Sequence, residues 1–157
     1  MRTFKKVQRV SGVDFELPKR STEFSAGYDF FSPARVEILP MKANPRPVLV
    51  KTGVKAYMTK DEFLMICNRS SNPAKKHLVI PNGIGIVDSD YVDNPDNEGE
   101  IGFLFYNTSD EPIIIEQGEK LGQGIFVKFS VTDDDNASGK RIGGFGSSGK
   151  WVIAKIY

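Results

Sequence analysis

The sequence predicts an all-β domain with little helix, folded as a sandwich or a jelly roll. Its apolar runs are short and rich in β-branched and aromatic residues, and Gly, Pro, Asn and Asp separate them. No window keeps the 3.6-residue apolar period of a helix. A chain of 157 residues suits one compact domain. We therefore expect an antiparallel β domain over residues 1–137 and a Gly-rich arm of the same domain over residues 138–157.

The strands are expected where these short apolar runs lie. β-branched residues support Pro47–Ala56 and Pro112–Ile115, and phenylalanines support Ile101–Tyr106 and Gly124–Val131. In chain order, the predicted strands are Phe4–Val10, Val36–Leu39, Pro47–Ala56, Glu62–Cys67, Leu78–Ile80, Gly85–Val87, Ile101–Tyr106, Pro112–Ile115 and Gly124–Val131.

The connections between strands carry clear local signals. A short helix is expected at Ser70–Lys76, and Asn82-Gly83 between apolar runs predicts a hairpin. Asp93–Glu100 is polar and rich in turn residues, so we expect a loop or a wide hairpin end there. Ser138–Lys150 is rich in Gly and Ser, which predicts a mobile arm, and the apolar Trp151–Tyr157 after it could dock.

Composition excludes several classes of function. Lys and Arg number 21 against 20 Asp and Glu, so no basic excess suggests nucleic acid as the partner. With Cys67 as the one cysteine and His77 as the one histidine, neither a disulfide within the chain nor a Cys/His zinc cage can form. No apolar run approaches the roughly 20 residues of a membrane span, and the polar start lacks a signal-peptide core. We expect a cytoplasmic protein, whether a cell or a virus encodes it.

The Gly-rich arm invites two readings. Gly144–Gly149 matches the letters of a dinucleotide-binding motif and resembles a phosphate-binding loop, but the strand before it and the helix after it are missing. A flexible linker is the simplest interpretation of this composition. Arg141, Phe145, Ser147 and Ser148 favour a flap that wraps phosphate instead, because they supply charge, hydroxyl donors and a stacking face.

Two further segments are open to both structural and functional interpretation. Asp88 and Asp90 would point to the same side of an extended chain. They could be carboxylates at a strand end that face water, or one could be the base of a nucleotide pocket. Arg69-Ser70-Ser71 could cap the short helix or bind an anion.

Taken in order, five segments of the chain resemble the five motifs of the trimeric dUTPase family. They are Ala26–Phe30, Arg69–Ser71, Gly85–Tyr91, Gly118–Gln123 and Arg141–Gly149. The third and fifth are specific, whereas the other three are weak when taken singly. The resemblance implies a distorted jelly-roll subunit in a homotrimer with shared active sites, each closed by the arm of a neighbour. It also implies hydrolysis of dUTP to dUMP and pyrophosphate with Mg²⁺, which removes dUTP and supplies dUMP for dTMP synthesis.

The resemblance also implies a role for each matching residue. Asp88 would orient and deprotonate the water that attacks the α-phosphorus, and Asp29 would reach the metal through water. Main-chain groups at Gly85 and Val87, with Asn82, would read the uracil, and Tyr91 would lie under the deoxyribose. The remaining substrate-binding residues would be Arg69, Ser70, Ser71 and Gln123 along the phosphates, Arg141 at the γ-phosphate, Phe145 over the uracil, and Gly146, Ser147 and Ser148 in the arm.

The sequence departs from the family pattern at three points. Asn68 stands where a Pro is usual, Asp93–Glu98 looks inserted, and Ile142 alone separates Arg141 from the Gly pair, which makes Lys140 an alternative holder of the γ-phosphate. Two other functions stay open. One is a dCTP deaminase, alone or combined with dUTPase activity, and the other is a non-catalytic regulator that docks a partner through the inserted loop.

Overall fold

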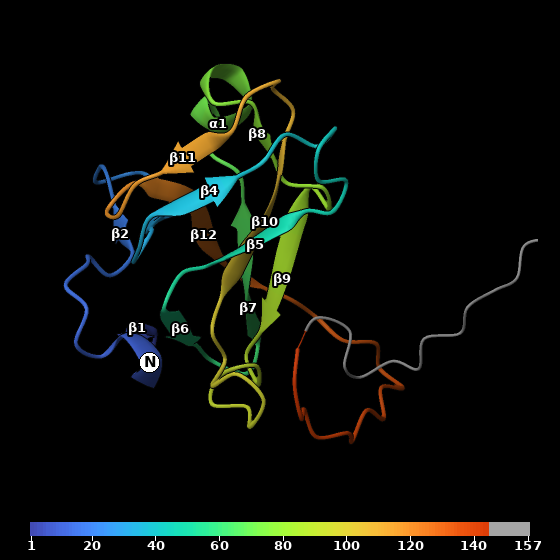
Figure 1. The fold of residues 1–157 in the computed structure, drawn as a ribbon. Coiled ribbons are helices and arrows are strands. Elements are labelled where there is room, and N and C mark those ends of the chain that lie inside the picture. The colour runs from blue at the N-terminus through green and yellow to red at the C-terminus, as the bar shows by residue number, and fades with distance from the viewer. Residues whose placement is uncertain (145–157) are drawn as a thin grey trace, which may run out of the picture.

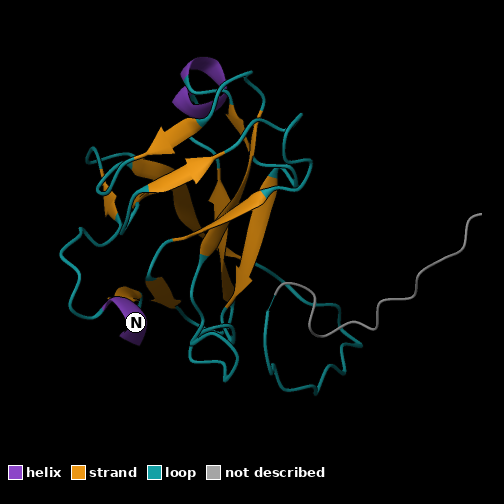
Figure 2. Ribbon diagram, viewed as in Figure 1, coloured by secondary structure: helices purple, strands orange, loops and turns teal. Residues whose placement is uncertain are grey.

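The computed structural model describes residues 1–144, and these form an almost entirely β domain (Figures 1 and 2). Helix is confined to the 3-10 turn η1 (Gln8–Val10) and the five-residue α1 (Ser71–Lys75). The prediction of an all-β jelly roll with little helix is confirmed. The strands are β1 (Thr3–Lys6), β2 (Lys19–Arg20), β3 (Tyr28–Phe31), β4 (Val36–Ile38), β5 (Val48–Lys51), β6 (Val54–Tyr57), β7 (Glu62–Cys67), β8 (Leu78–Val79), β9 (Ile84–Asp88), β10 (Gly102–Asn107), β11 (Ile113–Ile115) and β12 (Lys120–Lys128).

Two antiparallel sheets form the main layers. One has five strands in the order β2-β3-β12-β7-β9, and the other has three in the order β5-β10-β8. β1 pairs with β6, and β4 pairs with β11, to make two small flanking ribbons. In Figure 1, β4 and β5 lie in front of β7 and β12. The core fills the space between the layers, where Phe30 of β3 meets Phe103 of β10 with ring centroids 5.6 Å apart.

The predicted N-terminal strand and the long strand after it are both interrupted. Phe4–Val10 continues as a strand only to Lys6, because the amide of Val10 donates to the carbonyl of Val7 and closes η1. Pro47–Ala56 was expected to be one strand, and the structure divides it at Gly53, which has φ +70°. The two halves serve different partners, since β5 pairs with β10 and β6 with β1.

Two strands of the large sheet differ from the sequence prediction. Tyr28–Phe31 was not expected to be a strand, yet β3 lies between β2 and β12. β12 was predicted from Gly124 but begins at Lys120, so the fourth motif is itself part of the sheet. By contrast, the prediction of Glu62–Cys67 agrees with β7 residue for residue.

The turn at Asn82-Gly83 exists, but the predicted hairpin of its two flanking strands does not. Gly83 has φ +71° and its amide donates to the carbonyl of Ile80. β8 before the turn pairs with β10, whereas β9 after it pairs with β7. The turn therefore carries the chain from one sheet to the other. In the part of the chain that is described, no helix has the length and apolar character needed to cross a bilayer.

Candidate active site

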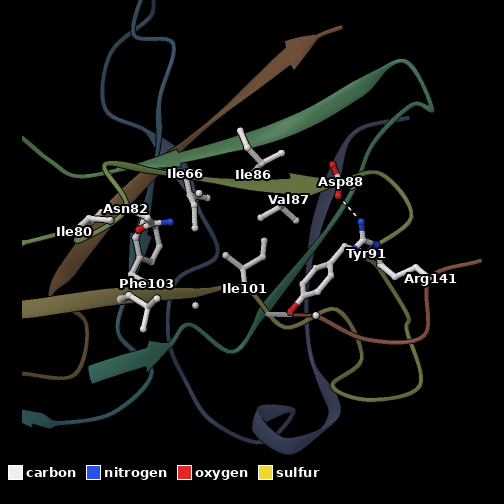
Figure 3. A pocket seen from close by; sticks show the side chains of 14 residues that line it. Ile66, Ile80, Asn82, Ile86, Val87, Asp88, Tyr91, Ile101, Phe103 and Arg141 are labelled. Carbon is white, nitrogen blue, oxygen red and sulfur yellow. Dashed lines mark hydrogen bonds and ion pairs between the residues drawn. The ribbon is translucent and has the colours of Figure 1, made fainter. Parts of the chain in front are cut away.

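A pocket of about 290 Å³ lies between β9 and β10, at the place where the two main sheets separate (Figure 3). Its floor is apolar, with Ile66, Ile101 and Phe103 among the lining residues. The predicted site residues that line it are Asn82, Gly85, Val87, Asp88, Tyr91 and Arg141. An apolar cavity with a few polar groups at its edge is the usual form of a small-molecule site.

Main-chain groups border this pocket on two sides. β9 is the edge strand of the five-stranded sheet, so one side of its backbone has no strand partner. β10 pairs with β5 over Gly102–Phe105, while β8 covers its other side only at Tyr106 and Asn107. The free sides of β9 and β10 therefore offer N–H and C=O groups at fixed spacing to a planar polar ligand.

Gly85 and Asn82 shape one end of the pocket. A Cβ at Gly85 would collide with Ile66, so only glycine lets β9 keep this approach to β7. The side-chain amide of Asn82 donates to the carbonyl of Ile84 at 2.7 Å, which fixes the orientation of the amide beside Gly85. These contacts fix the backbone on which ligand recognition would depend.

Asp88 and Arg141 lie at the mouth of the pocket. Asp88 is the last residue of β9, and its carboxylate forms an ion pair with Arg141 (Figure 3). The Nε of Arg141 donates to Asp90 at 2.6 Å, so one guanidinium bridges two carboxylates. The hydrogen bond to Asp90 is the main cause that raises the pKa of Arg141. As predicted, Asp88 and Asp90 face the same side, although a turn rather than a strand brings Asp90 there.

Tyr91 forms a wall of the same pocket. It is 8% exposed, and its ring lies 5.9 Å from the guanidinium carbon of Arg141. A Cβ at Gly144 would collide with this ring, so the start of the arm packs closely against it. Arg141 and Gly144 thus lie at the pocket of their own chain, whereas the predicted arm closes over a neighbour.

A second group of predicted residues gathers around Asp29 on β3. Its Oδ1 accepts from Nε of Arg69 at 3.1 Å, and its Oδ2 accepts from Ser21 at 2.7 Å and from Lys120 at 2.6 Å. Burial opposes the charged form, but the hydrogen bonds from Lys120 and Ser21 and the charge of Arg69 outweigh it and lower the pKa of Asp29. Asp29 is therefore an anion that holds two cations in place.

Ser70, Ser71 and Gln123 belong to this second group. Ser70 precedes α1, makes no side-chain capping bond and is exposed to solvent. The hydroxyl of Ser71 accepts a hydrogen bond from Arg69 at 3.4 Å. Gln123 donates to the carbonyl of Asn68 at 3.4 Å. A Cβ at Gly27 would collide with the Gln123 side chain, which explains why the first and fourth motifs must fit together.

The two groups are too far apart to act together within one chain. Both Gln123 and Asp88 lie on the outer face of the large sheet, where Gln123 is opposite Cys67 and Asp88 is opposite Phe63. Four residues along β7 and two steps between strands separate them, which corresponds to roughly 16 Å. Side chains of a strand stand roughly perpendicular to the sheet and a hydrogen bond reaches only about 3 Å, so Gln123 and Asp88 of one chain do not converge on the same small group.

Sequence reasoning missed several residues of these two groups. Lys120 and Ser21 complete the Asp29 group, and Asp90 holds Arg141. Lys120 lies inside the fourth motif, so its charge was a usable signal. Nothing in the sequence marks Phe103 or Ile101 as pocket residues, because any buried strand has such side chains. The predicted positions Phe145, Gly146, Ser147 and Ser148 lie outside the described residues.

Comparison with known proteins assigns the chain to a family. The family model for dUTPase matches residues 13–149. A deoxyuridine 5'-triphosphate nucleotidohydrolase of Lactococcus lactis subsp. lactis is 44% identical over 151 residues, which cover 95% of this chain and 98% of the relative. The crystal structure of dUTPase from Streptococcus mutans is similar with a TM-score of 0.75 and 41% identity, covering 83% of this chain and 98% of that one.

A more distant structure shares the fold. It is a mutant dUTPase from phage phi11 of S. aureus, which is described with a coordinated structural Mg(II) ion. Its TM-score is 0.67 at 19% identity, and the match covers 88% of this chain and 97% of that one. The match to the family model and the relative that is 44% identical carry the assignment. This chain belongs to the dUTPase family.

Proposed function

We propose that the protein is a dUTP diphosphatase, which hydrolyses dUTP to dUMP and pyrophosphate. The observation that carries this proposal is the pocket between β9 and β10, where free main-chain edges flank an apolar floor and the Asp88 carboxylate stands at the mouth. Such a pocket suits a flat base with polar edges, and its mouth suits the phosphates that follow. Membership of the dUTPase family supports the same substrate.

Main-chain groups near Gly85 and Val87, together with Asn82, read the edge of uracil. Hydrogen bonds matched to uracil leave buried polar groups unpaired when cytosine is bound, which is a strong basis for rejection. The proposal further requires that uracil fits closely between β9 and β10, so that the methyl group of thymine is excluded. Tyr91 packs under the deoxyribose, where the 2′-hydroxyl of a ribose would clash.

The chemical step is the attack of one water molecule on the α-phosphorus. Asp88 orients the water and accepts its proton as the new O–P bond forms. The bond from the α-phosphorus to the bridging oxygen breaks, and pyrophosphate leaves with the electron pair of that bond. The half-exposed carboxylate of Asp88 can reach solvent at the mouth, so the proton can then pass to bulk water.

The phosphate-binding residues come from a second subunit of a homotrimer. The outer face of the large sheet supports this arrangement, because Ile86 of β9, Met65 of β7 and Ile125 of β12 form an apolar row across it. Antiparallel sheets usually present polar side chains to water on their outer face. Covering this face with other copies removes the apolar row from water and brings Gln123 and Ser70 of one chain to Asp88 of another.

Arg141 clamps the γ-phosphate after it leaves its present partners. In the free chain it is paired with Asp88 and Asp90, and both carboxylates are about half exposed. Exposed ion pairs of this kind contribute only about 0–1 kcal/mol each to the free energy of unfolding. Phosphate oxygens can accept two hydrogen bonds from a guanidinium, as a carboxylate does, and they carry more negative charge. The triphosphate of the substrate can therefore displace Asp88 and Asp90 from Arg141. This exchange would free Asp88 for the water, while the later arm residues Phe145 to Ser148 close over the nucleotide.

Magnesium enters as part of the substrate. Within residues 1–144, no three His, Cys, Asp or Glu side chains lie together as a cage for an ion. The carboxylate of Asp29 is already bonded to Arg69, Ser21 and Lys120, so it fits contact through water better than direct ligation. Bound to the triphosphate, the ion would neutralise charge on the leaving group.

Release of pyrophosphate from dUTP, measured beside dTTP, dCTP and UTP, tests the proposal. We expect rapid release from dUTP and at least about tenfold slower release from the others. The discrimination against dCTP should be the strongest, up to roughly 10⁴-fold, because cytosine leaves buried polar groups unpaired. Ammonia produced from dCTP would identify a deaminase instead. Nucleotide binding without turnover of any of the four would favour a regulator.

A further inference from the structure

The inserted loop between Tyr91 and β10 is tied to the pocket wall. It spans residues 92–99 and closes on itself, since the amide of Asp93 donates to the carbonyl of Glu98 at 3.1 Å and that of Glu98 to Asn94 at 3.0 Å. Asp93 and Glu98 both adopt positive φ, at 58° and 63°. A loop that holds two non-glycine residues in this region is strongly determined by its contacts.

A nearly buried lysine anchors the loop to the domain. Lys55 of β6 donates to Asp93 at 2.6 Å and to Glu98 at 2.7 Å, and its side chain is 11% exposed. Tyr57 of the same strand donates to the other oxygen of Asp93 at 2.8 Å. These bonds compensate the charge of Lys55 and raise its pKa despite burial, which acts in the opposite direction. The base of the loop is therefore fixed.

Within the loop, Asn97 points its amide at the pocket wall. Its Nδ2 donates to the hydroxyl of Tyr91 at 2.7 Å. Its Oδ1 accepts from Asn94 at 2.8 Å and from the amide of Gly99 at 3.0 Å, so the orientation of the amide is fixed by three partners. Asn94, which is 5% exposed, also donates to the carbonyl of Tyr91 at 2.8 Å.

The hydroxyl of Tyr91 is thereby held from two sides. It accepts from Asn97 and donates to the carbonyl of Glu100 at 3.1 Å. Burial raises the pKa of Tyr91, and the hydrogen bond from Asn97 opposes that effect without reversing it, so the hydroxyl stays a donor at neutral pH. With both ends of the side chain fixed, the ring cannot swing away from the pocket that it lines beside Ile101 (Figure 3).

We propose that Asn97 is a positioning residue that sets discrimination between deoxyribose and ribose by fixing the phenol ring of Tyr91. This inference rests on the proposed function, in which the ring excludes the 2′-hydroxyl. A ring that can tilt makes room for the 2′-hydroxyl of a ribose. Loss of the hydrogen bond from Asn97 should therefore increase the hydrolysis of UTP more than it decreases the hydrolysis of dUTP. The inserted loop, which departs from the family pattern, thus contributes to substrate choice.

Asn97→Asp keeps an oxygen for Asn94 and Gly99 but removes the N–H that donates to the Tyr91 hydroxyl. That hydroxyl has a single proton, so it can donate to the new carboxylate or to the carbonyl of Glu100, and one of its two hydrogen bonds is lost. We expect the ratio of kcat/KM for UTP to that for dUTP to rise by roughly three- to tenfold, the range that one net hydrogen bond supports. The kcat for dUTP should stay within about twofold, since Asn97 does not touch the reacting atoms. Asn97→Ala should shift the ratio in the same direction. Asn44→Asp is the matched control, as it makes the same change in a turn remote from the pocket and should leave the ratio unchanged.

A double-mutant cycle separates positioning from general loop damage. Tyr91→Phe lacks the hydroxyl, so adding Asn97→Asp to it should change the ratio little further. The inference is overturned when folded Asn97→Asp and Asn97→Ala proteins keep the wild-type ratio, or when Asn97→Asp acts equally strongly with and without the hydroxyl. Failure of the wild-type protein to hydrolyse dUTP is a different result, which refutes the proposed function and this inference together.

Discussion

Replacing Asp88 with Asn tests the central role assigned to this pocket. The substitution keeps the size of the side chain and its place at the end of β9 but removes the base that accepts the proton of water. A positioned general base contributes about 10²- to 10⁴-fold to a rate, so we expect kcat for dUTP to fall by this amount. Binding should persist, because the base-reading groups are main-chain atoms that the change leaves in place.

The structure also predicts that this loss does not come from unfolding. The Asp88 carboxylate is about half exposed and its protein partner is Arg141. An exposed ion pair contributes at most about 1 kcal/mol, and the variant should keep most of the wild-type free energy of unfolding. A fall in kcat of this size with only a small change in stability therefore reports on chemistry.

Asp90→Asn supplies the matched control. Asp90 binds the same guanidinium at 2.6 Å and is similarly exposed, but it has no role in the proposed proton transfer. Initial rates of pyrophosphate release and the Kd for a non-hydrolysable dUTP analogue should be measured for both variants. Near-normal turnover by Asp88→Asn would refute its role as the base. An equal loss in Asp90→Asn would instead show that the charge beside Arg141 matters and that a base at Asp88 does not.

Two further predictions concern the arm and the fold. Truncation before Lys140 should leave a folded protein, judged by thermal melting, whose turnover falls on the order of a hundredfold, because phosphate positioning is lost; an unchanged kcat would refute the closing role of the arm. Glu62 accepts hydrogen bonds from Arg2 and Thr59, which lower its pKa from 4.5 to about 2. Its pairing therefore stabilises the fold above pH 4.5 and is lost as the pH falls toward 2. In urea unfolding, Glu62→Gln should have a lower free energy of unfolding than the wild type at neutral pH. Its free energy of unfolding should also decrease less as the pH falls from 4.5 toward 2, and an identical decrease in both proteins would contradict this assignment.

Local signals in the sequence were sufficient for much of the fold. The run Glu62–Cys67 predicts β7 correctly because it is apolar, β-branched or aromatic, and bounded by polar residues. Asp93–Glu100 is a loop, as its turn residues indicate. β3 escaped prediction because it is short and carries the buried acid Asp29, which in isolation resembles a turn residue. Only partners distant in the sequence, Arg69 and Lys120, make that charge acceptable inside a sheet.

The site was predictable by its residues but not by its contacts. The motif order gave Asn82, Gly85 and Asp88, and these do line one pocket. The pairing of Arg141 with Asp88 joins positions 53 residues apart, and no sequence pattern specifies it. Likewise, the insert was visible as extra polar residues, whereas its bond from Asn97 to Tyr91 depends on the backbone turns that close the loop.

Mixing two inactive variants tests whether the site is shared between chains. Asp88→Asn disables the pocket, and Ser70→Ala removes an exposed hydroxyl from the Asp29 group without breaking a bond within the described residues. Suppose that Asp88 and Ser70 act from neighbouring subunits. In trimers assembled from an equal mixture, a site is then intact when its Asp88 comes from a Ser70→Ala chain and its Ser70 comes from an Asp88→Asn chain. Random assembly makes about one quarter of the sites intact, so the mixture should recover about 25% of wild-type turnover when each variant alone has little. Refolding the two together and measuring pyrophosphate release would show it. Recovery no greater than the average of the two variants would mean that Asp88 and Ser70 act from the same chain. That result would contradict the shared site, which we infer from the separation of roughly 16 Å between Gln123 and Asp88 within one chain.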